Sequence, residues 1–207
     1  MKKYIAELIG TYFLVFTIGN VVLGGSAGAL APLPIGLSLA VMIFALGHIS
    51  GGHFNPAVSL AVYLRGKLDT KDFGPYVGAQ VIGAVLAALT AQFLQGHGGA
   101  GTGVAHAVPA FVAELIGTFA LATVVLNVAT TKANQGNSFY GAAIGLTVTA
   151  MAFAVGGVSG GAFNPAVAIG GAVMGLFAWS QIWIYLVGCL AGGALAAIVF
   201  KSIKADD

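Results

Sequence analysis

The sequence predicts an all-α membrane protein with six transmembrane helices and two re-entrant half-helices, arranged as an inverted repeat of two halves. Three observations predict this fold class. Of the 207 residues, 58% are apolar and only 7% are Asp, Glu, Lys or Arg, whereas a soluble domain carries about a quarter charged residues. Several apolar runs are long enough to cross a bilayer, and one nonapeptide occurs twice. This composition excludes an ordinary water-soluble enzyme, and the net charge of +2 is too small to indicate a nucleic-acid partner.

Six apolar runs approach the length of about 20 residues that a helix needs to cross roughly 30 Å of hydrocarbon. We predict spans at residues 5–24, 33–49, 75–94, 108–128, 138–157 and 179–200. Two further apolar pieces, at 55–64 and 164–176, are too short to cross. Because backbone at membrane depth must be buried in protein or line a wet cavity, each piece is predicted to enter the membrane and return on the same side.

The basic residues predict the orientation of these spans. With this topology all eight Lys and Arg residues fall on one face of the membrane, and the positive-inside rule makes that face cytoplasmic. They are Lys2, Lys3, Arg65, Lys67, Lys71, Lys132, Lys201 and Lys204. The loop on the other face, at 96–107, has no Lys or Arg. We therefore expect a multi-pass protein of a cell membrane, with both termini in the cytoplasm.

The two halves of the chain repeat each other. The segment AELIGT at 6–11 recurs at 113–118, and SGGHFNPAV at 50–58 recurs at 159–167 with only its fourth residue changed. Each half contains three spans, so the second copy enters from the opposite side of the membrane. Such inverted repeats occur in channels and in many transporters. We expect residues 1–207 to form a single channel domain, built of repeats at 1 to about 100 and about 108 to 207.

Small residues spaced by four predict where helices pack closely, because they let the backbones approach. Any one such pair can occur by chance in a chain with 32 glycines. Two of the pairs, however, lie at equivalent positions of the two halves, which favours real packing contacts. The predicted contacts are Gly141-x-x-x-Gly145, Gly188-x-x-x-Gly192 and Ala79-x-x-x-Gly83.

An Asn-Pro-Ala tripeptide begins each short apolar piece: Asn55-Pro56-Ala57 and Asn164-Pro165-Ala166. Asn caps a helix and Pro fills its first position, where no N–H is needed. A helix of about ten residues reaches about half the bilayer. Two half-helices entering from opposite faces would meet through their N-termini, where two positive dipole ends and two Asn amides face each other. A pore at that point would offer donors to a water oxygen and repel cations and protons.

The segment HISGGHFNPAV at 48–58, together with the two AELIGT segments, resembles the aquaporin or major intrinsic protein family, and especially its bacterial water channels. The resemblance extends over essentially the whole chain. It implies a right-handed six-helix bundle with a pore in every subunit, assembled as a homotetramer in membrane lipid. It implies no cofactor.

The sequence departs from the family at the residue that follows the second Asn-Pro-Ala. Most members have Arg there and this chain has Val167; the resemblance places the other selectivity-filter positions at Ile35, Ala152 and Gly161. Water-selective relatives usually have Phe and His at the first two, and glycerol-conducting relatives usually follow the motif with Arg-Asp. Small or apolar groups supply neither a cation nor side-chain donors, so we expect a wider, less polar constriction. We expect water to pass, and small neutral solutes such as ammonia, hydrogen peroxide or urea to follow.

Three other polar residues are candidates for roles near the pore. Glu7 and Glu114 lie near the starts of spans one and four, where the helix dipole favours a carboxylate in the first turn. The resemblance implies that they brace the pore loops, with a proton relay as the alternative. His53 is a possible pore-lining residue on the cytoplasmic side. Together with His48 it lacks a third nearby ligand, so we expect no metal site.

Three classes of function remain open. Nothing in the sequence indicates catalysis, since it has no phosphate-binding loop, nucleophile elbow or paired catalytic carboxylates. A passive channel is favoured over a secondary transporter because coupled transport generally needs a titratable group at the substrate site, and the predicted midplane has only Asn. Saturable uptake would indicate the transporter, and flux linear in concentration the channel. A non-conducting structural membrane protein is the third class.

Overall fold

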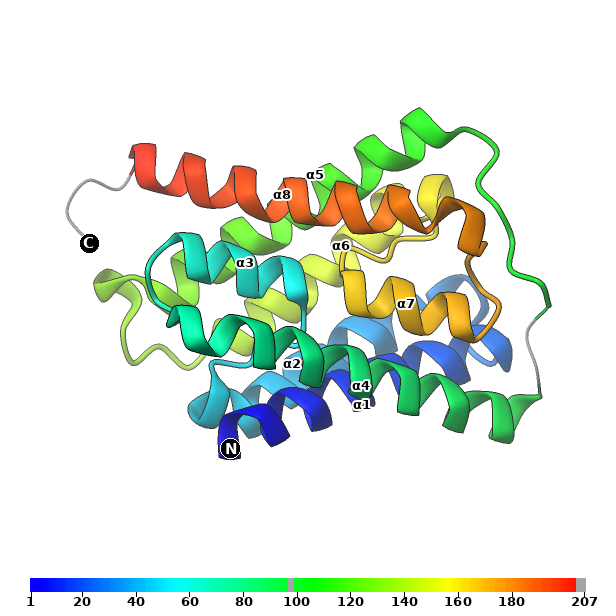
Figure 1. The fold of residues 1–207 in the computed structure, drawn as a ribbon, viewed down its shortest axis with the longest axis horizontal. Helices are drawn as coiled ribbons and strands as arrows, with labels where there is room; N and C mark the ends of the chain where they lie inside the picture. Colours follow the sequence, from blue (N-terminus) through cyan, green and yellow to red (C-terminus); the bar gives the residue numbers. More distant parts are fainter. Residues whose placement is uncertain (97–98, 204–207) are drawn as a thin grey trace.

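The computed structural model describes residues 1–96 and 99–203, so that Lys204 lies outside the described residues. Six helices are long and apolar enough to cross a membrane, and they form one bundle (Figure 1). They are α1 (Lys2–Leu23), α2 (Pro32–Ser50), α4 (Thr70–Gln95), α5 (Ala107–Thr130), α6 (Tyr140–Ser159) and α8 (Ile182–Ile203). Two short helices, α3 (Pro56–Leu64) and α7 (Pro165–Val173), lie between them. The predicted all-α fold with two half-helices is confirmed.

Short 3₁₀ segments and one isolated bridge complete the secondary structure of the described ranges. The 3₁₀ segments are η1 (Gly28–Leu30), η2 (Lys132–Asn134) and η3 (Trp179–Gln181). Within 1–96 and 99–203 the only β-type pairing is a parallel bridge between Thr102 and Phe177. The bridge joins the connection between α4 and α5 to the connection between α7 and α8.

The predicted helix ends differ most at α4, which begins at Thr70, five residues before the predicted start at Pro75. The first three of the added residues, Thr70, Lys71 and Asp72, are polar, and hydropathy marks only the apolar part of a helix. Asp72 stabilises this polar start by accepting hydrogen bonds from the Tyr4 hydroxyl, at 2.7 Å, and from the Lys3 ammonium group. The N-terminal turns of α1 and α4 are thus joined through one carboxylate.

The two halves pack as an inverted repeat, in which α1 to α4 correspond to α5 to α8. Helix α1 packs along α4, α5 packs along α8, and α2 meets α6 between the halves. Each half-helix contacts a long helix of the other half, α3 against α8 and α7 against α4. Figure 1 shows α3 and α7 end to end in the middle of the bundle. The centre of the molecule is therefore built from both halves.

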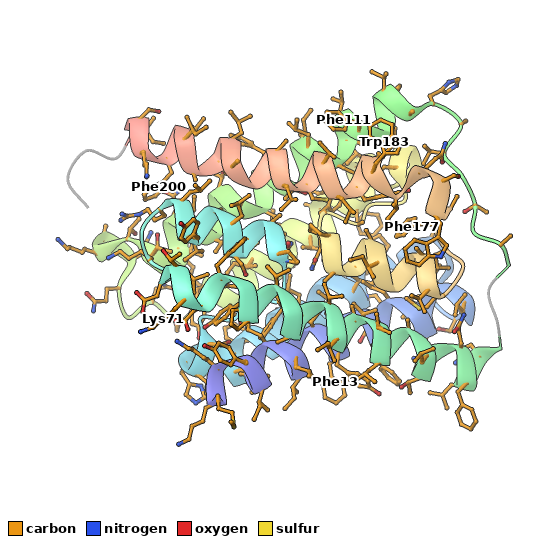
Figure 2. The ribbon with its side chains drawn as sticks, in the orientation of Figure 1. Phe13, Lys71, Phe111, Phe177, Trp183 and Phe200 are labelled. Carbon is orange, nitrogen blue, oxygen red and sulfur yellow. The ribbon has the colours of Figure 1, made fainter. Side chains whose placement is uncertain are left out.

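The two ends of the bundle differ in charge. Helix α1 begins and α8 ends at the same end (Figure 1), which we name the terminal end; the other is the opposite end. The described Lys and Arg residues all belong to segments at the terminal end, where Figure 2 labels Lys71. At the opposite end Trp179 and Trp183 are 55% and 49% exposed, and Trp183 stacks on Phe111 (Figure 2).

Small residues set the spacing of the long helices. A Cβ atom on Gly145 of α6 would lie 2.3 Å from the Gly36 carbonyl oxygen of α2. A Cβ atom on Gly192 of α8 would lie 2.4 Å from the Leu115 carbonyl oxygen of α5. Such distances exclude any side chain. The predicted glycine contacts on α6 and α8 are therefore confirmed.

Candidate pore

The two half-helices begin at the middle of the bundle with the same capping geometry. The Asn55 side-chain oxygen accepts hydrogen bonds from the backbone N–H groups of Ala57, at 2.8 Å, and Val58, at 3.4 Å. Asn164 makes the equivalent bonds at 2.9 and 3.4 Å. Each Pro takes the first helical position, where its missing N–H costs nothing. The repeated tripeptide thus forms two caps of nearly identical geometry.

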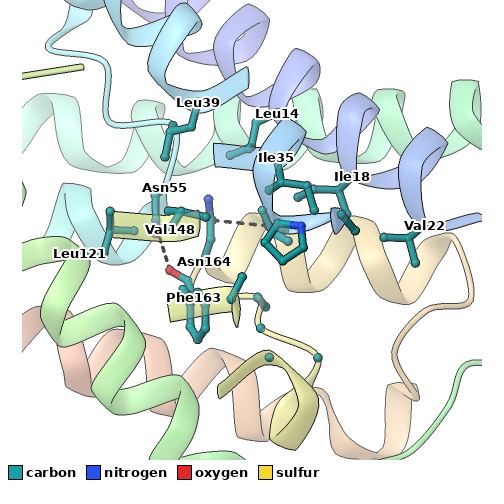
Figure 3. A pocket seen from close by; sticks show the side chains of 18 of the residues that line it. Leu14, Ile18, Val22, Ile35, Leu39, Asn55, Leu121, Val148, Phe163 and Asn164 are labelled. Carbon is teal, nitrogen blue, oxygen red and sulfur yellow. Dashed lines mark hydrogen bonds between the residues drawn. The ribbon is translucent and has the colours of Figure 1, made fainter. Parts of the chain in front are cut away.

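The caps are also bonded to each other across the junction. The Asn55 amide nitrogen donates to the Phe163 carbonyl oxygen at 2.9 Å, and the Asn164 amide nitrogen donates to the Phe54 carbonyl oxygen at 2.9 Å. Figure 3 shows the two Asn side chains side by side, with dashed lines for bonds between the residues drawn. A side-chain amide has two N–H donors, so each Asn keeps one N–H beyond this bond.

The Phe residue before each Asn has an unusual backbone conformation. Phe54 has φ +46° and Phe163 has φ +47°, a left-handed region that costs a non-glycine residue about 1–3 kcal/mol. The Phe54 ring occupies the place of a side chain on Gly10, where a Cβ atom would lie 2.1 Å from it. The Phe163 ring does the same at Gly117, at 2.3 Å. The glycine of each AELIGT segment therefore receives the ring that anchors the strained residue.

The glutamate of each AELIGT segment is fully buried and accepts four hydrogen bonds. Glu7 accepts from the Ser50 hydroxyl and the His53 N–H at 2.7 and 3.0 Å, and from the Phe54 N–H and the Gln80 amide, both at 2.7 Å. Glu114 accepts in the same pattern, from Ser159, Ala162 and Phe163 at 2.6–3.0 Å and from the Cys189 thiol at 3.4 Å. The segment before each half-helix thus supplies three of the four donors, and a long helix supplies the fourth, Gln80 of α4 or Cys189 of α8.

The expectation that these glutamates occupy the first turn of a helix is wrong. Glu7 is the sixth residue of α1 and Glu114 the eighth residue of α5, and neither first turn contains an acidic residue. The helix dipole falls off within the first turn and does not account for the position of the carboxylates. The backbone N–H and hydroxyl groups of the adjoining loops, which donate hydrogen bonds to the carboxylates, account for that position.

The two halves differ in the polar side chains behind these loops. In the first half the Gln80 amide nitrogen bridges Glu7 and the Ser59 hydroxyl, which lies 3.1 Å from His53 Nδ1. A carboxylate only accepts hydrogen bonds, so the Gln80 side-chain nitrogen is the donor to Glu7. The Ser59 hydroxyl accepts from the same nitrogen and can donate its own hydrogen bond to His53 Nδ1. His53 would then carry its proton on Nε2. The equivalent positions of the second half, Ala162, Ala168 and Cys189, have no such network.

One cavity of about 420 Å³ is lined by part of the predicted pore residues, without Pro56, Ala57, Pro165 and Ala166 of the two motifs. Its lining includes both motif asparagines and all four residues assigned to the filter: Asn55, Asn164, Ile35, Ala152, Gly161 and Val167. Figure 3 shows the apolar lining that extends from the asparagines toward Val22 on one side and Leu121 on the other. The polar side chains of this lining are thus few, and the two asparagines lie near its middle.

A second cavity, of about 830 Å³, occupies the terminal end of the bundle. Charged and polar residues line it, including Lys67, Asp69 and His48. His53 lines both cavities, and its side chain is 8% exposed. The structure therefore places His53 where the two cavities adjoin.

Several residues of the site were not predicted from the sequence. Phe54 and Phe163 stand in the repeated nonapeptide, and their recurrence was the available signal. The position of Gln80 is occupied by Cys189 in the second half, so a comparison of the two halves does not single out Gln80. Thr102 lines the first cavity from a connection that has no repeat equivalent, and no sequence signal indicated it.

Comparison with known proteins identifies the family. A sequence model described as "Major intrinsic protein" matches residues 1–200. "Aquaporin NIP1-1" of Zea mays is 36% identical over 99% of this chain and 75% of its own length. "Glycerol uptake facilitator protein-like 6" of Lactiplantibacillus plantarum is 36% identical over the whole of both chains.

The fold also matches a solved structure, that of the aquaglyceroporin from Plasmodium falciparum. The TM-score is 0.84 at 24% identity, over 98% of this chain and 96% of that one. At this identity the match supports the fold alone. Together with the sequence matches, which cover essentially the whole chain, it leads to one conclusion: the chain is a multi-pass membrane protein that belongs to the major intrinsic protein family of channels.

Proposed function

We propose that this protein is a passive channel for water and for small neutral solutes, namely ammonia, hydrogen peroxide and urea. The observation that carries the proposal is the meeting of Asn55 and Asn164 inside one cavity, each with an amide N–H left over after its bond across the junction. These N–H groups can donate to a passing oxygen. Two positive helix ends at the same place repel cations and interrupt a proton-conducting chain of waters.

The solute range follows from the proposed filter. Ile35, Ala152, Gly161 and Val167 provide no charge and no side-chain hydrogen bond donor, and they line the same cavity as the asparagines. An uncharged constriction selects mainly by diameter, so small neutral molecules other than water can enter. The printed name of the Lactiplantibacillus relative, a glycerol uptake facilitator-like protein, adds glycerol to the solutes worth testing.

The buried polar groups have supporting roles in this proposal. Glu7 and Glu114 brace the two pore loops, since each accepts two backbone N–H groups from its loop. His53 lines the path on the terminal-end side, between the two cavities. Proton transfer through the glutamates is not favoured, because all their donors belong to residues of the structural loops and the flanking helices.

The whole chain, residues 1–207, acts in this proposal as one channel domain in a cell membrane. The concentration of Lys and Arg at the terminal end supports a cytoplasmic location for that end and for both termini. Residues from both halves of the chain surround the cavity, which supports a separate pore in each subunit of the proposed homotetramer. Native mass spectrometry in lipid nanodiscs tests the tetramer, and protease protection of terminal tags tests the orientation.

The experiment that tests the channel is stopped-flow light scattering on proteoliposomes. Water, ammonia, hydrogen peroxide, urea and glycerol are measured against protein-free vesicles of the same lipid. A channel gives flux that is linear in solute concentration and depends weakly on temperature, whereas a transporter gives saturable flux. Permeability equal to that of empty vesicles for water and for every solute would contradict the proposal and favour a structural role.

A further inference from the structure

The connection between the two halves, around residues 99–106, contributes to the first cavity at the opposite end. Thr102 lines that cavity together with Leu176 and Phe177, which follow α7, and with the four residues of the proposed filter. The repeat has no second copy of this connection. The mouth of the cavity at the opposite end, which we name the outer mouth, therefore has a wall with no counterpart on the terminal-end side.

The contacts of Thr102 fix this wall in place. Its backbone forms the parallel bridge with Phe177, and its hydroxyl oxygen lies 3.1 Å from the Leu176 carbonyl oxygen, to which it donates. Gly101 has φ +81°, and a Cβ atom there would lie 2.4 Å from the Phe177 carbonyl oxygen. The chain approaches so closely that only glycine fits.

Two further contacts make the base of this wall rigid. The Gln181 side-chain oxygen accepts from the Val104 N–H at 2.7 Å, and its nitrogen donates to the Val104 carbonyl oxygen at 3.2 Å. Phe177 is 8% exposed, with its ring centroid 4.5 Å from that of Tyr185. Thr102 is therefore held at a defined position at the mouth.

The lining of the mouth makes Thr102 chemically distinct. Among the described residues that line the first cavity, only His53, Asn55, Asn164 and Thr102 have polar side chains. His53 also lines the terminal-end cavity, and the two asparagines lie at the junction. Thr102 is thus the polar side chain of the outer half. Because its hydrogen is donated to Leu176, its oxygen lone pairs remain available as acceptors.

We propose that Thr102 is a specificity-determining residue that accepts hydrogen bonds from small neutral solutes bearing N–H groups, of the urea and ammonia class. This inference rests on the proposed function. A urea molecule that enters the apolar filter must give up water at four N–H groups, whereas a water molecule has only two donors. A fixed acceptor at the mouth replaces part of that lost hydration, and the filter side chains supply no other acceptor.

The test compares urea and water permeabilities of proteoliposomes containing the wild type, Thr102→Val and Thr102→Ser. Valine keeps the shape and the backbone bridge but removes the acceptor. The urea-to-water permeability ratio should fall about fivefold, the factor for one ordinary hydrogen bond, and serine should restore it. Thr147→Val is the matched control, because Thr147 bonds its own helix at Ala143 and is absent from the cavity lining.

The outcomes separate this inference from the proposed function. A purely structural role of Thr102 would change the water and urea permeabilities in parallel, and an unchanged ratio in Thr102→Val would overturn the inference. Wild-type protein that conducts water but neither urea nor ammonia would overturn it as well. Wild-type protein that conducts nothing would instead overturn the proposed function.

Discussion

The Asn55 side-chain amide donates a hydrogen bond to the Phe163 carbonyl oxygen, at 2.9 Å, and so joins the N-terminus of one half-helix to the loop before the other. The reciprocal bond from Asn164 to Phe54 has the same length. Each Asn therefore caps its own helix and holds the other loop at once. The position of both half-helices depends on this pair of bonds.

Replacing Asn164 should destabilise the protein as well as alter the junction. Asn164→Ala removes a cap that contributes about 1–2 kcal/mol and leaves the buried Phe54 carbonyl without its donor, at a further cost of about 1–3 kcal/mol. Thermal unfolding in detergent measures the loss. Asn134→Ala, which removes one bond to the Asn127 carbonyl oxygen at the terminal end, should lower the unfolding temperature far less. Equal effects of the two substitutions would contradict this assignment.

The two glutamates should differ in how well they tolerate an amide. In either Glu→Gln variant an N–H group faces donors, and each unpaired buried donor costs about 1–3 kcal/mol. Glu7→Gln should be the more destabilising, because it disturbs the Gln80 amide at 2.7 Å, whereas the weaker thiol donor of Cys189 lies 3.4 Å from Glu114. Denaturation midpoints of both variants check the order, and the reverse order would show that the fourth donor is not the deciding contact.

A methyl group at Gly10 should displace the first pore loop. In Gly10→Ala the new carbon would lie 2.1 Å from the Phe54 ring, so the ring must leave the site that stabilises its left-handed backbone. We expect a clear loss of stability and of water permeability. Gly78→Ala is the control, since no atom lies within 4 Å of a Cβ atom at that helical position; it should be neutral or slightly stabilising. Full permeability in Gly10→Ala would contradict the role given to the ring.

The helix dipoles and asparagines at the junction should exclude protons without a filter arginine. Wild-type proteoliposomes carrying an internal pH-sensitive dye should acidify no faster than empty vesicles under a pH gradient, while their water permeability is raised. The expected cause is the reorientation of water at the two N-termini. Proton flux that rises with the amount of protein would show that the junction is insufficient.

Hydropathy and capping chemistry were sufficient to predict the helices. Long apolar runs placed all six spans, and each Asn-Pro pair placed a half-helix start that the structure has at Pro56 and Pro165. The start of α4 was missed because Thr70, Lys71 and Asp72 are polar, and a carboxylate network rather than lipid stabilises that turn.

The parts of the site that depend on tertiary contacts could not be predicted. Phenylalanine does not favour positive φ, and its conformation at Phe54 becomes understandable only with the empty space over Gly10. Thr102 is similar in this respect. It is an ordinary threonine in a connecting loop, and it lines the cavity because Gly101 lets the chain lie against Phe177. In both cases the decisive partner is distant in sequence.

Substitutions at Val167 test whether the protein is a passive pore with an uncharged filter. Val167→Arg adds a cation and bulk, whereas Val167→Met adds length without charge. Urea and water permeabilities of both variants are measured in proteoliposomes beside the wild type. We predict that arginine lowers the urea-to-water ratio at least about tenfold, a barrier increase of about 1.4 kcal/mol, while methionine changes it much less. Equal urea-to-water permeability ratios in the arginine variant and the wild type would contradict the assignment of Val167 to the filter, and with it the proposed uncharged pore.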